Sequence, residues 1–350
     1  MQFTFARIPA AVPYPPRFRF CRMERIEAMG DQIPSNSQEI LSEDALKNYP
    51  KPLSPPLPAL SQPIELSRAM SASSRSSLFS FSRSDIIFED QWLMAVNKPA
   101  GVYCENVLSS IATLFTNSTQ SETGSSSLEL HLANRLDRDT SGLMLVTKSH
   151  KVAAKLVKAF TEHKVRKTYI AHCVGIAPKW EKITIKSGHG RSKYGVWRVY
   201  AASDVGKKLP GGSVVKDMET TIEVLSINGK ERSIESSEER VLVVEERSVV
   251  GSDTADNSEK DEVLVRARPR SGRTHQIRLH CQYLGISILG DVKYEGVYER
   301  KGKIYQGHEL HAESISFEHP ITGLSVMFRA PLPSWASDQT DTSMNCIPNT

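Results

Sequence analysis

The chain has 350 residues, of which 39% are hydrophobic and 24% are charged, and its formal net charge at pH 7 is +4. This composition is ordinary for a soluble globular protein and excludes a chain that is disordered throughout. The sequence holds no run of about 18 apolar residues, so we expect no transmembrane helix and no membrane partner.

The cysteines indicate the redox compartment. They are scattered, odd in number and form no C-x-x-C pair: Cys21, Cys104, Cys173, Cys281 and Cys346. Such a set predicts neither a disulfide framework nor a zinc site. We therefore expect a reducing, intracellular environment.

The amino-terminal segment gives an equivocal targeting signal. Its first 22 residues contain four arginines and no acidic residue, which is typical of an organelle transit peptide. Prolines interrupt the segment and serines are few, which argues against that interpretation. The cytoplasm, the mitochondrion and the chloroplast all remain candidate locations.

Three parts are expected along the chain. Residues 1–84 are predicted to be a disordered or targeting tail followed by a linker, because residues 50–63 contain six prolines and residues 71–84 are rich in serine. One short helix is expected within this part, at 64–72. Residues 85–333 are predicted to form the folded domain, and residues 334–350 a C-terminal tail.

Several elements of the domain can be predicted from hydrophobic patterning. Two short strands are expected at 86–90 and 92–96, followed by a tight turn at 97–101. A buried strand at 143–147 precedes a helix that begins after Ser149 and ends near residue 163. Another strand is expected at 168–174.

Two insertions are predicted in this domain. Residues 109–127 are rich in serine and threonine and should be exposed. Residues 228–262 hold eleven acidic and five basic residues, with a strand expected at 240–246. A solvated loop is the simpler interpretation of this acidic stretch, and an arm that mimics nucleic acid is the alternative. Its net charge of −6 leaves +10 on the rest of the chain, which permits a polyanionic partner.

A charged loop precedes the strand at 143–147. Residues 134–142 read Asn-Arg-Leu-Asp-Arg-Asp-Thr-Ser-Gly. Guanidinium groups beside Asp137 favour its ionised form, which makes Asp137 a candidate nucleophile or base. A surface turn held by salt bridges is the alternative interpretation.

A second segment begins with a turn at Gly272 and continues as a helix capped by Thr274. His275 and Arg278 share one face of this helix, and the opposite face holds Ile277, Cys281 and Leu284. Five arginines between residues 263 and 290, with no acidic residue among them, predict either RNA contact or a solvated basic face: Arg266, Arg268, Arg270, Arg273 and Arg278. His275 and His280 fall on different faces, so no metal site is expected.

A third segment, at 167–171, places Tyr169 in a strand. Together the segments resemble the RluA-type pseudouridine synthase family over residues 85–333. The matching motifs are Asn-Lys-Pro-Ala-Gly at 97–101, Arg-Leu-Asp at 135–137, Thr-Ser-Gly at 140–142, Lys-x-Tyr-x-Ala-x-x-x-Gly at 167–175, Gly-Arg-Thr-His-Gln-Ile-Arg-x-His at 272–280, Ile-Leu-Gly-Asp at 288–291 with Tyr294, Leu-His-Ala at 310–312 and His-Pro-x-Thr-Gly at 319–323. Asn134 departs from the histidine that the family usually has there.

The resemblance implies an α+β fold, with a mixed, mostly antiparallel central sheet and helices around an RNA-binding cleft. It implies isomerisation of uridine to pseudouridine in RNA, with no metal, nucleotide or redox cofactor. The sequence itself contains no P-loop or dinucleotide fingerprint. A tRNA or rRNA uridine is the expected target, and a monomer is the default expectation.

The resemblance also implies residue roles. Asp137 is the expected catalytic residue, acting either by addition to C1′ or by removal of a ribose proton. Tyr169 is expected to pack on the uracil and to assist deprotonation at C5, and Arg278 to pair with Asp137 and position it. Arg135 is expected to hold the flipped nucleotide. The expected phosphate contacts are Lys98, Arg273 and a lysine face formed by Lys151, Lys155 and Lys158.

Two other functions remain open. Asp137 and Asp139 resemble the paired carboxylates of a haloacid-dehalogenase-type phosphatase, although the strongly apolar strand that precedes that pair is missing here. A catalytically silent RNA-binding protein is the second alternative, against which the presence of Asp137, Tyr169 and Arg278 argues.

Overall fold

The computed structural model describes residues 49–59, 61–76, 78–118, 129–231, 240–246 and 260–337, all within one compact unit, Asn36–Thr350. The amino-terminal segment with its equivocal targeting signal lies outside the described residues. Residues 119–128 and most of the acidic insertion also lie outside them.

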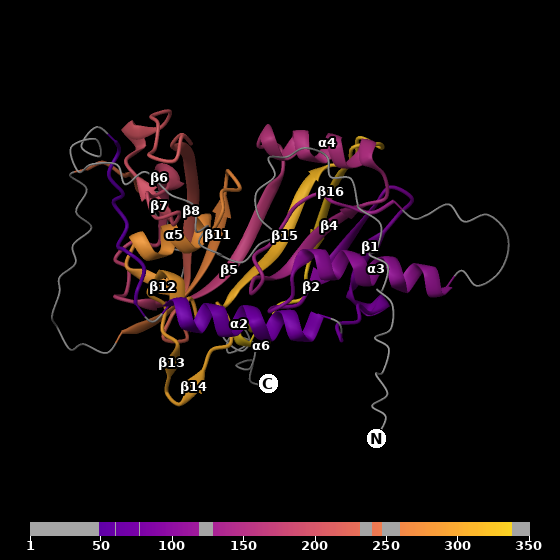
Figure 1. Cartoon of the computed structure of the whole chain (residues 1–350), viewed down its shortest axis with the longest axis horizontal. Helices are drawn as coiled ribbons and strands as arrows, with labels where there is room; N and C mark the ends of the chain where they lie inside the picture. The colour runs from indigo at the N-terminus through magenta and orange to yellow at the C-terminus, as the bar shows by residue number, and fades with distance from the viewer. Residues whose placement is uncertain are drawn as a thin grey trace, which may run out of the picture. The chain divides into compact units, whose positions relative to one another are not determined.

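A mixed β-sheet of 14 strands lies at the centre of this part of the chain (Figure 1). Its main path runs, in order, through β1 (Ile86–Glu89), β2 (Leu93–Lys98), β4 (Ser141–Thr147), β15 (Leu310–Glu318), β5 (Arg166–Gly175), β11 (Asp261–Pro269), β8 (Lys216–Ile227), β6 (Lys182–Arg191) and β10 (Arg240–Val243). Along this path β4–β15 and β6–β10 pair in parallel and the other pairs are antiparallel. The predicted α+β class is confirmed.

Shorter elements complete the described fold. The remaining strands are β3 (His131–Leu132), β7 (Trp197–Tyr200), β9 (Lys230–Glu231), β12 (Ile286–Ile288), β16 (Ser325–Arg329) and a separate hairpin of β13 (Glu299–Arg300) and β14 (Lys303–Ile304). The helices are α2 (Ser61–Ser76), α3 (Cys104–Ser118), α4 (His150–Thr161), α5 (Gln276–Tyr283), α6 (Ser334–Ser337) and the 3₁₀ turns η1 (Arg83–Asp85), η2 (Ala202–Asp204) and η3 (Val292–Tyr294). None of these helices is long and apolar enough to cross a membrane.

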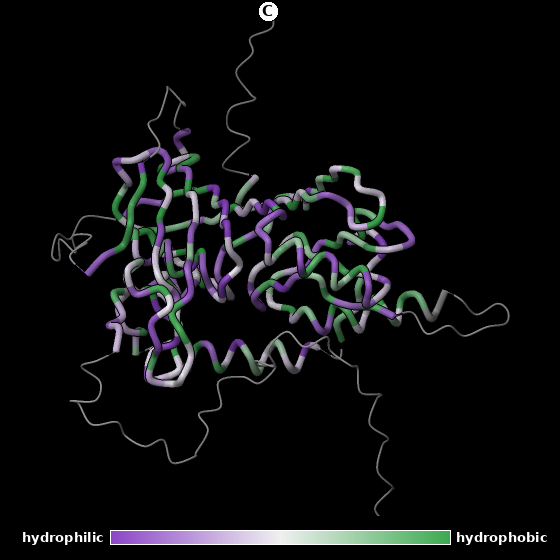
Figure 2. The backbone as a smooth tube through the Cα atoms, turned by 90° about the horizontal axis from the view of Figure 1, so that it is seen from above, coloured by the Kyte–Doolittle hydropathy of each residue, from purple (hydrophilic) through white to green (hydrophobic). Residues whose placement is uncertain are grey.

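The elements with clear periodicity lie where the sequence predicts them. Strands β1, β2, β4 and β5 match the expected ranges to within a few residues. Ser149 caps α4, since its hydroxyl accepts a hydrogen bond from Val152 N at 3.4 Å. Buried and less buried residues alternate along β8, as expected for a strand that packs one face against the core. Figure 2 shows hydrophobic and hydrophilic stretches interleaved throughout the described part of the chain.

The predicted linker and C-terminal tail are both shorter than expected. Leu53 N donates to Val199 O at 2.8 Å, so the proline-rich segment lies against β7. Residues 61–76 form α2, which exceeds the short helix expected there. At the other end, Ala336 of α6 is buried against Ile170 and Leu264 of the sheet. Proline and serine content does not reveal these tertiary contacts.

The first predicted insertion begins too early. Residues 109–118 complete helix α3, in which Ile111 is fully buried with Val107 against Met94 and Met144. The serines and threonines of this stretch concealed its apolar positions. Within the acidic insertion, β10 forms the expected strand and pairs in parallel with β6.

The centre of the sheet brings sequence motifs from distant parts of the chain side by side. β4 approaches β15 so closely that a Cβ on Gly142 would lie 2.3 Å from Ala312 O, and Gly142 also has a φ of 105°. Only glycine suits this position. Helix α5 packs Ile277 and Cys281 onto the face of β5 and β11, which confirms its predicted inward face.

Candidate active site

The loop between β3 and β4 carries Asp137 and is fixed at both ends. The side-chain oxygen of Asn134 accepts a hydrogen bond from Leu145 N at 2.8 Å. Ala133 N donates to Leu145 O at 3.0 Å, and Thr140 N closes a turn onto Asp137 O at 3.1 Å. Asn134, where the sequence departs from the family pattern, thus ties the loop to β4 through its own side chain.

Helix α5 holds Asp137 from the opposite side. Asp137 Oδ2 accepts a hydrogen bond from Arg278 Nη1 at 2.8 Å. Arg278 Nε and Nη2 donate to the two oxygens of Asp291 at 2.7 and 2.9 Å. The Asp291 side chain is 1% exposed, whereas that of Asp137 is 30% exposed. A buried carboxylate therefore orients Arg278 toward a carboxylate that a substrate can reach.

His275 completes this wall of the site. It precedes α5 with a φ of 58°, a left-handed conformation that costs a non-glycine residue energy. Its Nδ1 is 2.8 Å from Tyr294 Oη, and its Nε2 is 3.8 Å from Asp137 Oδ2. The helix begins one residue later than a cap at Thr274 would place it: His275 is the N-cap, and its side chain makes no capping hydrogen bond.

The surroundings of Asp137 keep its carboxylate ionised. Burial favours the neutral acid, but positive charge on His275, Arg278 and His308 and the hydrogen bond from Arg278 lower the pKa of Asp137 well below 3.8. Burial also lowers the pKa values of His275 and His308. The two imidazoles are therefore neutral at pH 7, and Arg278 supplies the stabilising charge under physiological conditions.

Tyr169 lies on the same side of the sheet as α5. Ala171 and Cys173, which follow it at alternate positions on β5, belong to the core beneath α5, and Tyr169 packs against that core. Burial, with a contribution from the negative charge of Asp137, raises the pKa of Tyr169 above its usual value of 10. Tyr169 is thus a protonated phenol beside an ionised carboxylate.

The prediction that Lys98 contacts RNA is wrong. Its side chain is fully buried, and Nζ donates to the backbone oxygens of Pro99, Val102 and Arg138 at 2.9, 2.8 and 2.9 Å. Burial lowers the pKa of Lys98 to about 8. Lys98 therefore joins the turn after β2 to the loop of Asp137 from inside the molecule, and its donors are engaged there.

The other predicted contacts differ in accessibility. The Arg135 side chain is 57% exposed and lies 3.0 Å from Glu105. Arg273 donates to the backbone oxygen and the carboxylate of Asp217 at 2.9 and 2.6 Å, so it is partly engaged. The lysine face of α4 is exposed: Lys151, Lys155 and Lys158.

The arginines of β11 and Arg270, which directly follows that strand, do not form an unpaired basic surface. Each has an acidic neighbour: Arg266 with Glu313 at 3.5 Å, Arg268 with Glu223 at 2.8 Å and Arg270 with Glu219 at 3.4 Å. Glu219 and Glu223 lie on β8, and β-pairing brings them beside β11. A stretch without acids in the sequence is therefore compensated by acids from a neighbouring strand.

Asp139 does not form a free pair of carboxylates with Asp137, as a phosphatase of the dehalogenase type would require. Both of its oxygens accept hydrogen bonds from Arg138, each at 2.6 Å, and only 5% of its side chain is exposed. Across the described ranges, no group of three or more His, Cys, Asp or Glu side chains is arranged to hold a metal ion.

Sequence reasoning assigned no role to two residues of the site. Asp291 orients Arg278, and the sequence carries a signal for it, because Asp291 is the first acid after the arginine-rich stretch. His308 Nε2 lies 2.7 Å from Thr140 Oγ1 at the end of the Asp137 loop. No local sequence signal marks His308, since the segment just before β15 brings it to the loop from the far end of the chain.

Comparisons with known proteins identify the family. The family model described as RNA pseudouridylate synthase matches residues 92–283. The chain is 60% identical over 306 residues to RNA pseudouridine synthase 1 of Arabidopsis thaliana (87% of this chain, 92% of that protein). It is 59% identical over 304 residues to RNA pseudouridine synthase 1 of Oryza sativa subsp. japonica (84% and 85%).

A bacterial relative is more distant. The ribosomal large subunit pseudouridine synthase C of Pasteurella multocida (strain Pm70) is 30% identical over 265 residues, which span 71% of this chain and 64% of that protein. These matches agree with the ordered series of motifs and with the site that those motifs form. The chain belongs to the RluA-type family of RNA pseudouridine synthases, enzymes that isomerise uridine to pseudouridine in RNA.

Proposed function

We propose that Asp137 is the catalytic carboxylate of the uridine-to-pseudouridine isomerisation. The observation that carries this proposal is the bond between Asp137 and Arg278, which keeps a partly exposed carboxylate ionised at neutral pH. Its two candidate routes, addition to C1′ and removal of a ribose proton, both require that charge state.

The reaction conserves atoms. The bond from uracil N1 to ribose C1′ breaks, the base turns, and a bond from C5 to C1′ forms. N1 gains a proton and C5 loses one, so no oxidant, reductant or group donor enters the balance. Arg278 positions Asp137 for these steps, and Asp291 in turn positions Arg278.

Tyr169 packs on the uracil in this proposal. Because its raised pKa keeps the phenol protonated in the resting site, Tyr169 presents a neutral hydroxyl, and this hydroxyl assists the loss of the C5 proton through hydrogen bonding. A uridine within a helix must first leave the stack, at a cost of a few kcal/mol. Arg135, exposed on the Asp137 loop, is the residue that holds the flipped nucleotide or fills its place.

The substrate class in this proposal is a uridine of tRNA or rRNA, and the chain acts as a monomer inside the cell, in the cytoplasm or in an organelle. The name of the Pasteurella relative refers to the ribosomal large subunit, which makes rRNA the first RNA to examine. The scattered cysteines support a reducing compartment.

Pseudouridine mapping across cellular RNAs tests this function. Cells that lack the protein should lose pseudouridine at one or more sites, and the wild-type chain should restore those sites, whereas an Asp137→Asn chain should not. Fractionation of the same cells gives the compartment. An unchanged pseudouridine map would refute the proposed function in those cells.

A further inference from the structure

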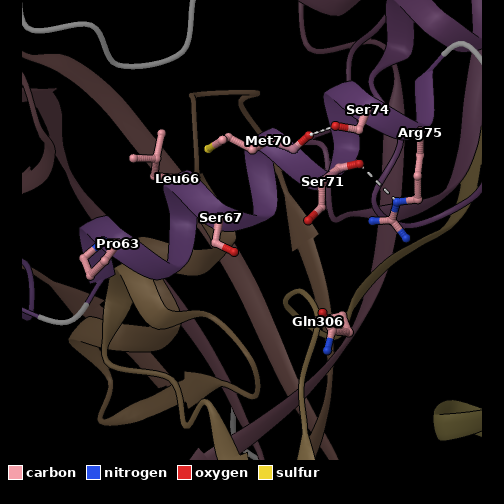
Figure 3. A pocket seen from close by; sticks show the side chains of 8 residues that line it. All are labelled: Pro63, Leu66, Ser67, Met70, Ser71, Ser74, Arg75 and Gln306. Atoms are coloured by element: carbon pink, nitrogen blue, oxygen red, sulfur yellow. Dashed lines mark hydrogen bonds between the residues drawn. The ribbon is translucent and has the colours of Figure 1, made fainter.

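Helix α2 precedes the region that the family model matches, and it docks without a buried apolar stripe. Its buried residues are Ser61, Arg68 and Ala72. Its large apolar side chains Leu66 and Met70 are 61% and 63% exposed, and Figure 3 shows both on the open side of the helix. An amphipathic helix normally buries such residues, so a different interaction must fix α2.

Arg68 supplies that interaction. Its Nη1 donates to Gly290 O at 2.9 Å and its Nη2 to Tyr305 O at 2.6 Å, with 7% of the side chain exposed. Among the described residues no acceptor faces its buried Nε, so desolvation of this guanidinium is not fully compensated. Gly290 directly precedes Asp291, the residue that orients Arg278.

Glu65 connects α2 to the other side of the site. One of its oxygens is 3.3 Å from Arg68 Nη1, and the other is 3.6 Å from Arg138 Nη2. Arg138 directly follows Asp137. Two charged side chains of α2 therefore contact the residue next to Asp291 and the residue next to Asp137.

We propose that Arg68 and Glu65 are positioning residues for the isomerisation. They hold the Asp291 loop and the Asp137 loop at the separation at which Arg278 binds both carboxylates. In Figure 1, α2 runs below the sheet, from beside β12 toward β2. This inference rests on the proposed function, because it requires Asp137 to carry the reaction.

The proposal separates chemistry from RNA binding. Without Arg68, the Asp291 loop is free to shift, and Arg278 loses its fixed orientation toward Asp137. The pKa of Asp137 then rises toward its usual value, and the carboxylate loses its alignment for reaction. RNA affinity should not change, because the Arg68 side chain is buried and neither Arg68 nor Glu65 is among the predicted RNA contacts.

The test uses the full chain and RNA extracted from cells that lack it, with pseudouridine formation followed in single turnover. Arg68→Ala should lower the rate at saturating enzyme about tenfold or more and shift the acid limb of the rate to higher pH. The apparent Kd for the RNA should stay within about twofold. Arg68→Lys, which retains the charge, should recover part of the rate.

Arg75→Ala is the matched control on the same helix. Arg75 is exposed, and its Nε donates to Ser71 O at 3.2 Å within α2 (Figure 3). This variant should match the wild type in rate, pH profile and affinity. Thermal unfolding of every variant measures the folded fraction to which each rate is normalised.

Two results would overturn the proposal: a folded Arg68→Ala protein with the wild-type rate and pH profile, or a loss confined to RNA affinity. If Arg68→Ala does not fold, Glu65→Gln removes one of the two charges at nearly constant size and is judged by the same criteria. Wild-type activity of Asp137→Asn would refute the proposed function instead, so the two failures are distinguishable.

Discussion

Asp137 Oδ2 accepts a hydrogen bond from Arg278 Nη1 at 2.8 Å, although the two residues are 141 positions apart in the chain. Two motifs that are distant in the sequence thus form one ion pair at an accessible position. Because Asp291 binds the rest of the guanidinium, Arg278 has a defined orientation before any substrate binds. Such preorganisation is what an ionised catalytic carboxylate needs.

Arg278→Lys should slow the isomerisation even though it retains the positive charge. A lysine ammonium cannot bind Asp291 at two points and Asp137 at a third, as the guanidinium does. We expect a rate reduction of about 10- to 100-fold. The pKa of Asp137 should rise, so that on acidification the variant loses its activity at a higher pH than the wild type does.

Single-turnover rates measured across the acid limb test this prediction. Arg266→Lys is the control, because Arg266 pairs with Glu313 on β15 and has no contact with Asp137. Equal rates and equal acid limbs for Arg278→Lys and the wild type would show that the geometry of Arg278 is unimportant.

Tyr169→Phe should affect proton transfer and leave RNA affinity unchanged. The substitution keeps the ring that packs on the uracil and removes only the hydroxyl group. If that hydroxyl assists the loss of the C5 proton, tritium release from RNA labelled at uridine C5 should slow by about 100-fold. Tyr169→Leu, which also removes the ring, should be slower still. Tritium release at the wild-type rate from Tyr169→Phe would limit Tyr169 to packing.

Lys98→Met should change stability and not RNA affinity. Loss of the three hydrogen bonds that the buried Lys98 ammonium donates to backbone carbonyls should lower the free energy of unfolding by about 1–3 kcal/mol at neutral pH. The pKa of Lys98 is lowered from 10.5 to about 8, so between these values the unfolded chain binds more protons than the folded chain. Wild-type stability relative to Lys98→Met should therefore rise across this window, by up to about 3 kcal/mol.

Urea unfolding of both proteins across this pH window measures the difference, and RNA titration of the folded variant provides the second measurement. If the free energy of unfolding of the wild type, relative to that of Lys98→Met, falls as the pH rises, the lowered pKa of a buried Lys98 is contradicted. A marked loss of RNA affinity would return Lys98 to the RNA interface.

The lysine face of α4 should contribute more to RNA affinity than Arg273. Replacing Lys151, Lys155 and Lys158 together by Gln should weaken binding and reduce the slope of log affinity against log salt by about 2, if each lysine contacts one phosphate of a single strand. Arg273→Gln should have a smaller effect, because Arg273 is bound to Asp217. Filter binding over a salt series measures the effect of both changes on RNA affinity. A larger effect from Arg273→Gln would indicate that the RNA binds over the segment that precedes α5.

The sequence predicted the parts of this molecule that local patterning determines. Strands β4 and β5 and the Ser149-capped helix α4 follow from periodicity and capping. The ordered motifs resemble one family, and that resemblance identified Asp137, Tyr169 and Arg278 as the expected site residues. Tertiary contacts decided the rest. Lys98 resembles a surface lysine until its three carbonyl partners are known, and α2 depends on Arg68 contacts with residues more than 200 positions away.

The same reasoning explains the electrostatic error. Five arginines without an intervening acid suggest a basic surface, but strand pairing sets Glu219 and Glu223 of β8 beside β11. The position of Asp291 was visible in the sequence, whereas its bidentate contact with Arg278 depends on how η3 packs against α5. Local charge patterns therefore identify candidates, and the sheet determines which of them are free.

The most direct test of the central claim is single-turnover pseudouridine formation by Asp137→Asn, measured at a uridine that the wild-type chain modifies. Asparagine retains the size and polarity of the side chain and removes its charge, so the rate should fall by about a thousandfold or more, with RNA affinity and thermal unfolding unchanged. A folded Asp137→Asn protein that modifies this uridine at a rate within about tenfold of the wild type would contradict the account.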